Sequence, residues 1–380
     1  MAVGPPHLYR KQGLEKKIPE TVLRNALAQA GSVQQRGLPP ILSIHHLAVL
    51  TGADYRYLRQ LVGRRRNPYR TFQIRKRSGG RRIISVPEPP LLAVQRWIST
   101  NVLAQLAPHP RSFAYAPNSS ILRCANEHLG CRWLVKLDVR RFFESITELR
   151  ISQLFREFGY QPLVSFEMAR LCTRVSEHRR PASSKLRVRG DRYVSIPAYR
   201  TFWLGHLPQG APSSPMLANL VARRLDENLT RLAEERSLIY TRYADDLIFS
   251  TAAPEFDRQA AKDLISSVCL AIRVEGFTPH TAKTVVVPPG ARKLVLGLLV
   301  DRAGPKLTRQ FRKRLTEHIR GIEKFGLIQH TSSRRFDSVW GLKRHVEGLL
   351  AFAEMVQPEL AEPLKTRFRE AVAASGWTSA

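Results

Sequence analysis

The sequence predicts an α+β protein, because strand and helix patterns alternate along most of the chain before a final run of helices. Two alternating strand patterns in residues 72–87 flank Ser78-Gly79-Gly80, which is typical of a β-hairpin. Short strands and helices then alternate to about residue 300. The last segment is helical, and five of its apolar residues recur at helical spacing. They are Val339, Leu342, Val346, Leu349 and Ala353. We expect these five to form a buried stripe.

The elements before the hairpin are also expected to be helical. Residues 1–37 form a basic, proline-containing leader with one helix at 19–30. Residues 43–62 predict two helices broken at Thr51-Gly52, with Ser43 as the N-cap of the first. The same pattern is typical of a helix-turn-helix, so a DNA-binding regulator is an alternative of a different functional class.

The charge balance indicates a polyanionic partner. Lys and Arg number 61 against 31 Asp and Glu, which gives a formal net charge of +30. Such an excess attracts nucleic acid, whereas an overall hydrophobic content of 43% is ordinary for a globular protein.

No membrane association is expected, because the first thirty residues lack an apolar signal core and apolar runs such as 294–300 are too short to span a bilayer. Four cysteines, Cys124, Cys131, Cys172 and Cys269, show no C-x-x-C spacing. Neither a zinc site nor a disulfide framework is therefore predicted, and a reducing, cytoplasmic location fits.

Three carboxylates carry the chemical hypothesis. Asp138 follows the apolar run 134–137, and Asp245-Asp246 lies between the strand-like runs 239–243 and 247–250. Adjacent aspartates repel each other unless a cation lies between them, and Mg²⁺ prefers carboxylate and phosphate oxygens. Two such ions about 3.5–4 Å apart can activate an attacking hydroxyl and stabilise a leaving pyrophosphate. Alone, an Asp-Asp turn is typical of an ordinary polar turn; with Asp138 and the motifs below, the sequence favours a two-metal site.

These motifs resemble the palm of reverse transcriptases. Y-A-D-D (243–246), L-D-V-R-R-F-F (137–143) and L-P-Q-G-A-P-S-S-P-M-L-A-N-L (207–220) match the order and spacing of the retron and group II intron branch. The resemblance covers about residues 40–360. It implies an RNA-directed DNA polymerase with two Mg²⁺ ions and a right-hand fold. Fingers and palm, an antiparallel sheet with helices, would occupy residues 38–300, and a helical thumb would occupy 301–380.

The resemblance also implies roles for residues around the nucleotide. Phe143 would lie under the sugar and exclude a ribose 2′-OH, unless it is a core aromatic like its neighbour Phe142. The Gln209-Gly210 turn would lie against the incoming deoxynucleotide, where glycine lets the backbone approach closely.

Three basic residues would contact the phosphates of the nucleotide. Lys76 and Arg82 match the fingers residues that grip the triphosphate, although Arg75, Arg77 and Arg81 compete for that role. Lys283 matches the lysine after the Y-A-D-D hairpin. A solvated basic surface is the alternative for each of the three.

Two further blocks resemble the hallmarks of retron enzymes, N-A-x-x-H and V-T-G. This chain has Cys124-Ala125-Asn126-Glu127-His128 and Val295-Leu296-Gly297, so each hallmark keeps its place and differs at one residue. The resemblance implies that Cys124, His128, Val295, Leu296 and Gly297 help to bind RNA.

Retron resemblance further implies several partners and a biological role. The partners would be a structured non-coding RNA as template and primer, dNTPs, a branched RNA–DNA hybrid product (retron msDNA), and a toxin or effector protein, in anti-phage defence. A group II intron-like or other defence-associated reverse transcriptase is the alternative within the family.

Overall fold

The computed structural model describes residues 6–75, 79–176, 199–300 and 304–376. Its internal contacts divide the chain into two units, each assembled from separated segments. Unit 1 comprises Met1–Pro117, Asp138–Leu229 and Ser266–Thr281, and unit 2 comprises Asn118–Leu137, Thr230–Ile265 and Ala282–Ala380. The domains expected from the sequence are instead consecutive segments, with boundaries at residues 37 and 300, and these boundaries stay a prediction.

Four helices open unit 1: α1 (Pro6–Glu15), α2 (Glu20–Gln35), α3 (Ile44–Thr51) and α4 (Tyr55–Val62). The predicted helix pair is confirmed, including its break. Ser43 accepts a hydrogen bond from the His46 amide at 3.1 Å, and Gly52 ends α3 at φ 68°. The leader helix starts after Pro19 as expected but runs on to Gln35. Helix α1 was not predicted, because its segment is polar and has little apolar periodicity.

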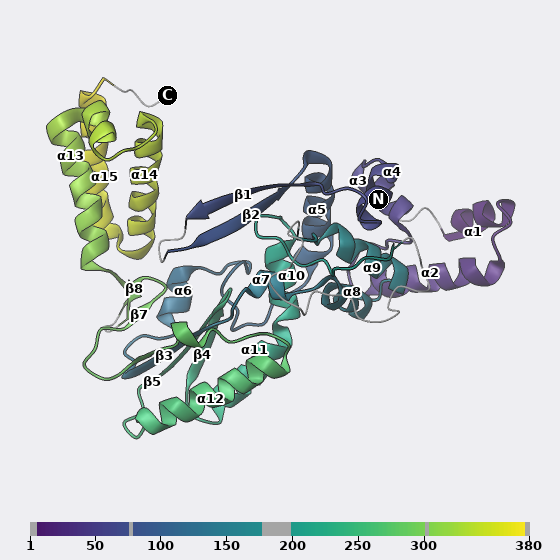
Figure 1. Ribbon diagram of the computed structural model, residues 1–380, viewed down its shortest axis with the longest axis horizontal. Coiled ribbons are helices and arrows are strands. Elements are labelled where there is room, and N and C mark those ends of the chain that lie inside the picture. The colour runs from purple at the N-terminus through teal and green to yellow at the C-terminus, as the bar shows by residue number, and fades with distance from the viewer. Residues whose placement is uncertain (1–5, 76–78, 177–198, 301–303, 377–380) are drawn as a thin grey trace. The chain divides into compact units, whose positions relative to one another are not determined.

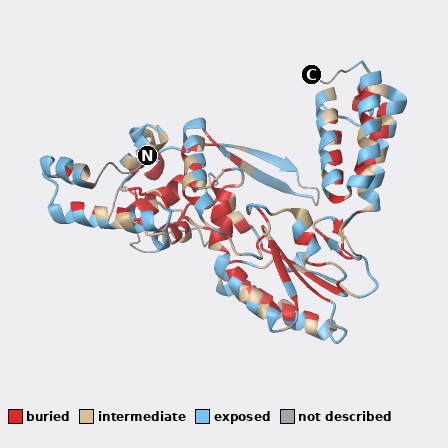
Figure 2. Ribbon diagram, turned by 180° about the vertical axis from the view of Figure 1, so that it is seen from behind, coloured by how far each residue is buried: buried red, intermediate tan, exposed pale blue. Residues whose placement is uncertain are grey.

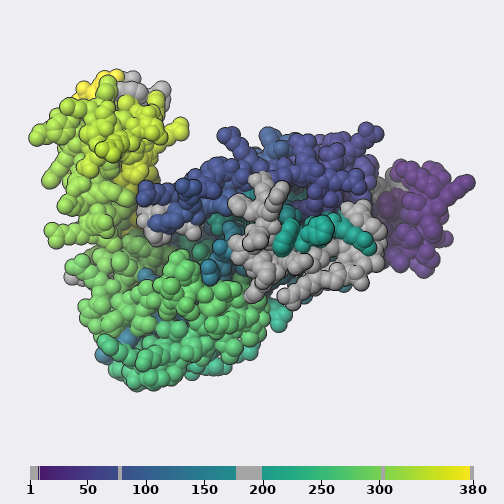
Figure 3. Space-filling view, viewed as in Figure 1, coloured from purple at the N-terminus to yellow at the C-terminus, as the bar shows by residue number. Residues whose placement is uncertain are grey.

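The predicted hairpin is confirmed as strands β1 (Tyr69–Arg75) and β2 (Arg81–Pro87). The strands pair antiparallel, with Phe72 opposite Ile84. Helix α5 (Pro89–Asn101) follows directly. Figure 3 shows the hairpin and helices α3 to α5, in blue, as one continuous surface of unit 1.

Further helices build the core of unit 1. They are α7 (Phe142–Ser145), α8 (Glu148–Glu157), α9 (Pro162–Leu171) and α10 (Ser214–Val221), with the 3₁₀ turn η1 (Leu103–Gln105). Helices α8 and α9 pack on each other and bury Ile151, Phe155 and Met168 between unit-1 elements. Helices α11 (Arg223–Glu234) and α12 (Arg258–Val274) cross the border between the two units.

A four-stranded sheet forms the centre of unit 2, in the order β4-β5-β3-β6. Its strands are β3 (Trp133–Asp138), β4 (Ile239–Tyr243), β5 (Asp246–Thr251) and β6 (Val285–Val287). The pairs β4–β5 and β3–β6 are antiparallel. Short helix α6 (Ile121–Asn126) packs on β4, and Figure 2 shows buried residues along the strands. A second antiparallel sheet contains β7 (Leu294–Val295), β8 (Leu298–Leu299) and β9 (Lys306–Leu307).

The C-terminal part of unit 2 is a bundle of α13 (Arg309–Ser333), α14 (Val339–Val356) and α15 (Pro358–Ala374) (Figure 1). Four residues of the predicted stripe are buried, namely Leu342, Val346, Leu349 and Ala353, whereas Val339 in the first turn of α14 is half-buried. Among the residues described, no helix is long and apolar enough to cross a bilayer. Antiparallel sheets with separate helices confirm the predicted α+β class.

Candidate active site

The three predicted catalytic aspartates lie at strand ends. Asp138 is the last residue of β3 and is 6% exposed, and its backbone oxygen accepts from the His280 amide at 2.7 Å. Asp245 lies in the turn that joins β4 to β5, and Asp246 is the first residue of β5. Strands β3 and β5 are neighbours in the sheet.

The donor set consists of carboxylates, the oxygen ligands that Mg²⁺ prefers. Across the described ranges, however, no three His, Cys, Asp or Glu side chains are grouped closely enough to hold a metal ion. The structure therefore provides donors of the right type on adjacent strands, and assignment of a metal to them is a proposal.

The turn at Asp245 has a strained and buttressed backbone. Tyr243 pairs with Asp246, so only Ala244 and Asp245 connect the strands, and Ala244 has φ 56°. A residue with a Cβ rarely adopts this conformation, and such strain is common at functional sites. The fully buried Arg242 donates from Nη1 to the Ala244 carbonyl at 3.2 Å, which ties the turn to its own strand.

The block from Cys124 to His128 lies against this hairpin. The side chains of Cys124 and His128 are fully buried, and both contact Thr241 of β4. Burial raises the pKa of Cys124 to about 11, an effect to which the Glu127 and Asp246 carboxylates add and which the contact with Thr241 opposes. Because neither side chain has exposed surface, each can act on RNA only through the elements that it supports.

The Val295-Leu296-Gly297 block forms the turn between β7 and β8. Leu296 has φ 48° and Gly297 has φ 88°, as a two-residue hairpin turn with both central residues at positive φ requires. Val295 is fully buried, so only Leu296 and Gly297 present surface at this turn. Direct contact of the block with RNA is thus restricted to these two residues.

The two aromatic residues after Asp138 differ in burial, as expected. Phe142 is 2% exposed and packs against Phe277, with ring centroids 5.6 Å apart. Phe143 is only half-buried and meets Tyr115 edge-on at 6.2 Å. Tyr115 is itself 52% exposed. Phe143 therefore lies at the edge of the core with one side accessible, which is compatible with contact to a sugar.

The Gln209-Gly210 turn lies directly against the β1–β2 hairpin. The Ser85 amide donates to the Gln209 carbonyl at 2.7 Å. Gly210 has φ 113°, and a Cβ there would lie 3.0 Å from Ile84 and 3.1 Å from the Ser85 carbonyl. Glycine is required at this position for both its backbone conformation and the close approach. A cavity of about 130 Å³ lies beside Gln209 and is also lined by Phe72 and Arg174.

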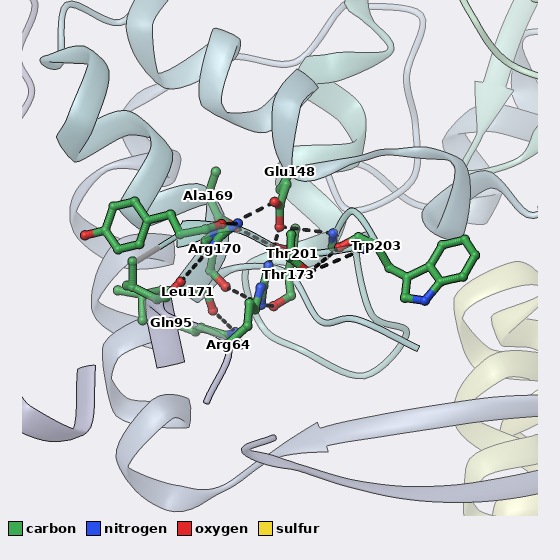
Figure 4. Close-up of polar contacts among 12 residues, drawn as sticks. Arg64, Gln95, Glu148, Ala169, Arg170, Leu171, Thr173, Thr201 and Trp203 are labelled. Carbon is green, nitrogen blue, oxygen red and sulfur yellow. Dashed lines mark hydrogen bonds and ion pairs between the residues drawn. The ribbon is translucent and has the colours of Figure 1, made fainter. Parts of the chain in front are cut away.

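A buried ion-pair network holds the segment that leads to this turn (Figure 4). Glu148, fully buried at the start of α8, accepts from Arg64 Nη2 at 2.5 Å and from the Gly205 amide at 3.0 Å. Arg170 Nε lies 3.4 Å from its other oxygen. A Cβ on Gly205 would collide with Arg64, Glu148 and Thr173, so the carboxylate fits the backbone without room for a side chain.

The predicted phosphate-binding residues are less constrained. Lys76 lies outside the described residues. Arg82 is exposed on β2 opposite Ile74, whereas Arg81 bonds to Gln73 at 3.0 Å. Lys283 is exposed at the end of the 3₁₀ turn η4 (Thr281–Lys283). Both Arg82 and Lys283 are therefore accessible to a solvent-borne anion.

Comparisons with known proteins identify the family. Residues 74–298 match the family described as reverse transcriptase (RNA-dependent DNA polymerase). The chain is 32% identical over 356 residues to the retron Mx65 reverse transcriptase of Myxococcus xanthus, covering 91% of this chain and 75% of that protein. This chain belongs to the retron-type reverse transcriptases.

Two other similar proteins are also retron reverse transcriptases. The retron Ec86 reverse transcriptase of Escherichia coli is 29% identical over 79% of this chain and 88% of its own length. The retron Mx162 reverse transcriptase of Myxococcus xanthus is 34% identical over 70% of this chain and 55% of its own length. A solved telomerase from Candida albicans aligns with 82% of this chain and 61% of its own at 12% identity, with a TM-score of 0.35, too low to support an argument.

This retron-type reverse transcriptase depends on buried charges that sequence reasoning did not identify. Glu148, Arg170 and Arg242 are all fully buried. The only signal was local: Glu167 and Arg170 interrupt the otherwise apolar helix α9, P-L-V-S-F-E-M-A-R-L. Charged residues on a buried helix face require partners, but the sequence does not say which.

Proposed function

We propose that Asp138, Asp245 and Asp246 bind two Mg²⁺ ions and so form the catalytic centre of this RNA-directed DNA polymerase. The observation that supports the proposal is the sheet order, in which the strand ending at Asp138 neighbours the strand beginning at Asp246. Bound there, the ions would activate the primer hydroxyl and stabilise the leaving pyrophosphate. The strained Ala244 turn and the buried Arg242 hold the paired aspartates in place.

The remaining residues of the site would bind and select the nucleotide. Arg82 and Lys283 supply exposed positive charge for the triphosphate, and Gln209-Gly210 lies against the base of the fingers hairpin. Phe143, accessible on one side, fills the space that a ribose 2′-OH would need, so that deoxynucleotides are preferred.

The metal assignment is tested by primer extension with Asp245→Asn. Loss of one ligand charge removes several kcal/mol of transition-state stabilisation, so extension should fall by about a hundredfold or more. RNA affinity should be unchanged, because the basic surface is intact. Asp257→Asn is the matched control, since Asp257 is exposed and caps α12 through a bond that asparagine can also make. Extension near the wild-type rate in Asp245→Asn would overturn the two-metal assignment.

For the biological reaction, we infer synthesis of a branched RNA–DNA hybrid (msDNA) on a cognate structured RNA. Support comes from the retron relatives and from the charge of +30. The turn formed by the half-buried Leu296 and the exposed Gly297 is the part of the V-L-G block that can contact this RNA. A role in anti-phage defence in the cytoplasm, with a toxin or effector protein as partner, belongs to the same proposal.

Sequencing of the nucleic acid that co-purifies with the protein tests this second proposal. One abundant structured RNA joined to a short DNA is the expected result. A random sample of cellular RNA would contradict it while leaving the polymerase activity in place. The helix-turn-helix alternative accounts only for α3 and α4, whereas the family match spans residues 74–298.

A further inference from the structure

We propose that His128 is a positioning residue that fixes the two strands of the catalytic hairpin relative to each other. This inference rests on the proposed role of Asp245 and Asp246, since it concerns the hairpin that carries them. In this inference the C-A-N-E-H block positions the β4–β5 hairpin and does not contact RNA directly.

The hydrogen bonds of the imidazole carry the argument. His128 Nε2 lies 2.7 Å from Thr241 Oγ1 on β4, and Nδ1 lies 2.7 Å from Ser250 Oγ on β5. One ring therefore joins both strands of the hairpin from a segment more than a hundred residues earlier in the chain. Backbone bonds pair β4 with β5 and β5 with β3, so β4 stands at the end of the sheet order and the imidazole adds a side-chain tie to it.

The bonds lie on the face of the sheet that carries Asp246. Side chains directly opposite in an antiparallel pair share a face, and alternate residues along a strand return to it. The pairs Tyr243–Asp246, Thr241–Ile248 and Ile239–Ser250 are therefore on one face. The Thr241–Ile248 pair lies two pairs and the Ile239–Ser250 pair four pairs from Tyr243–Asp246, so both hydrogen bonds of His128 are made on this face.

Cys124 reinforces the same contact. Its Sγ lies 3.4 Å from Thr241 Oγ1, so the Thr241 hydroxyl contacts both Cys124 and His128. The block thus contacts the hairpin at Thr241 on β4 and at Ser250 on β5.

Burial makes these bonds consequential. His128 and Thr241 have no exposed surface, and Ser250 is 2% exposed. A neutral imidazole offers one donor and one acceptor, and the two hydroxyls can rotate to match either tautomer. If the ring nitrogens were lost, two buried hydroxyls would lose a partner, and such groups are costly to leave unsatisfied. The strands would then shift to find other partners and would displace Asp246 with them.

His128→Phe tests the proposal, because it keeps a ring of similar size without the nitrogens. A catalytic group misplaced by about 1 Å can lose on the order of a hundredfold in rate, so we expect kcat for primer extension to fall by about 10- to 100-fold. The KM for dNTP and the affinity for RNA should stay near wild type, and the Mg²⁺ concentration for half-maximal activity should rise. Amides of residues 239–251 should exchange hydrogen faster, a readout independent of catalysis.

Two companion variants make the test specific. His128→Gln can still reach Thr241 with its amide and should recover part of kcat and of the hydrogen-exchange protection. Thr331→Val is the matched control for Thr241→Val, since Thr331 is a buried threonine of α13 that bonds to Leu327 at 2.7 Å. Thr241→Val should reproduce the loss of kcat, and Thr331→Val should not. Thr241→Val also serves as the test if His128→Phe does not fold.

The outcomes separate this inference from its alternatives. If His128→Phe and Thr241→Val both left kcat, the Mg²⁺ requirement and hairpin exchange at wild-type values, the inference would be wrong. If RNA affinity fell in parallel with kcat while hairpin exchange stayed unchanged, the block would be an RNA-binding element instead. Hydrogen exchange of the hairpin could be faster in His128→Phe while Asp245→Asn still extends primers. That result would support the role of His128 in holding the hairpin and would refute only the proposed metal site.

Discussion

Replacement of Glu148 by glutamine should destabilise the segment that leads to the Gln209-Gly210 turn. Glutamine keeps the size of the side chain and one acceptor oxygen but removes the negative charge. Arg64 and Arg170 would then face each other's charge without the carboxylate that now lies 2.5 Å and 3.4 Å from them. The Gly205 amide would also lose a charged acceptor at 3.0 Å.

The free-energy cost of Glu148→Gln follows from the burial of the ion pairs that it breaks. Breaking a fully buried ion pair by removing one partner costs about 3–5 kcal/mol, because the remaining charge is uncompensated. Here the remaining cations keep neutral acceptors: Arg64 bonds to the Thr173 carbonyl at 2.7 Å, and Arg170 to the Val62 carbonyl at 2.7 Å. We therefore expect the lower end, about 3 kcal/mol, which corresponds to roughly a hundredfold change in a local opening equilibrium.

Native-state hydrogen exchange measures this quantity directly. Peptides that cover residues 145–155 and 200–210 should lose protection by about two orders of magnitude in Glu148→Gln. Glu88→Gln is the control, because Glu88 pairs with Arg66 at 2.8 Å on the surface, where such pairs contribute about 0–1 kcal/mol. If the two variants changed protection equally, the buried network would not be holding this segment and the reasoning would fail.

Three further predictions concern charge, sugar selection and pH. Affinity for RNA should fall steeply with salt, with a log–log slope of about −0.7 to −0.9 per neutralised phosphate, and a nearly flat titration would assign the basic surface another purpose. Phe143→Ala should admit ribonucleotides with a modest loss of dNTP use in a competitive incorporation assay, whereas an unchanged ratio would make Phe143 a core residue. Burial, with His330 and His345 nearby, lowers the pKa of His318 to about 4, below its unfolded value of about 6.5. The unfolded chain therefore binds more protons between these values, so stability of the α13–α15 bundle should be lost as pH falls from about 6.5 to 4, and urea unfolding should show a weaker pH dependence in His318→Phe.

The parts of the fold that could be predicted depend on neighbours in the sequence. Ser43 and Gly52 define the ends of α3 by cap chemistry, and Gly79-Gly80, both at positive φ, lie directly before β2 of the β1–β2 hairpin. The stripe on α14 follows from helical periodicity alone. The division into units could not be predicted in this way, because each unit joins segments that are apart in the sequence; residues 138–229, for example, separate two segments of unit 2.

The same distinction applies to the site. Asp138, Asp245 and Asp246 follow from apolar runs that end in carboxylates and from motif order. Contacts among distant residues left no such trace: Arg64 and Glu148 are 84 residues apart, and His128 and Ser250 are 122 apart. For the C-A-N-E-H block, the sequence predicted that Cys124 and His128 help to bind RNA. Their burial against β4 and β5 leaves them no surface for direct contact with RNA.

Glu148 and His128 illustrate why polar residues are buried where apolar ones would also fill the space. Apolar packing is nearly indifferent to small displacements of a strand or turn, because its energy depends on buried area rather than direction. A hydrogen bond in a low-dielectric interior weakens steeply with misalignment and so defines position along one line. Glu148 applies this to a segment that is paired through isolated bridges of His206 with Thr147 and Arg174, and His128 applies it to the strands on either side of the two-residue turn strained at Ala244. In both places a buried polar side chain from elsewhere in the same unit adds a directional bond to those that the backbone already makes.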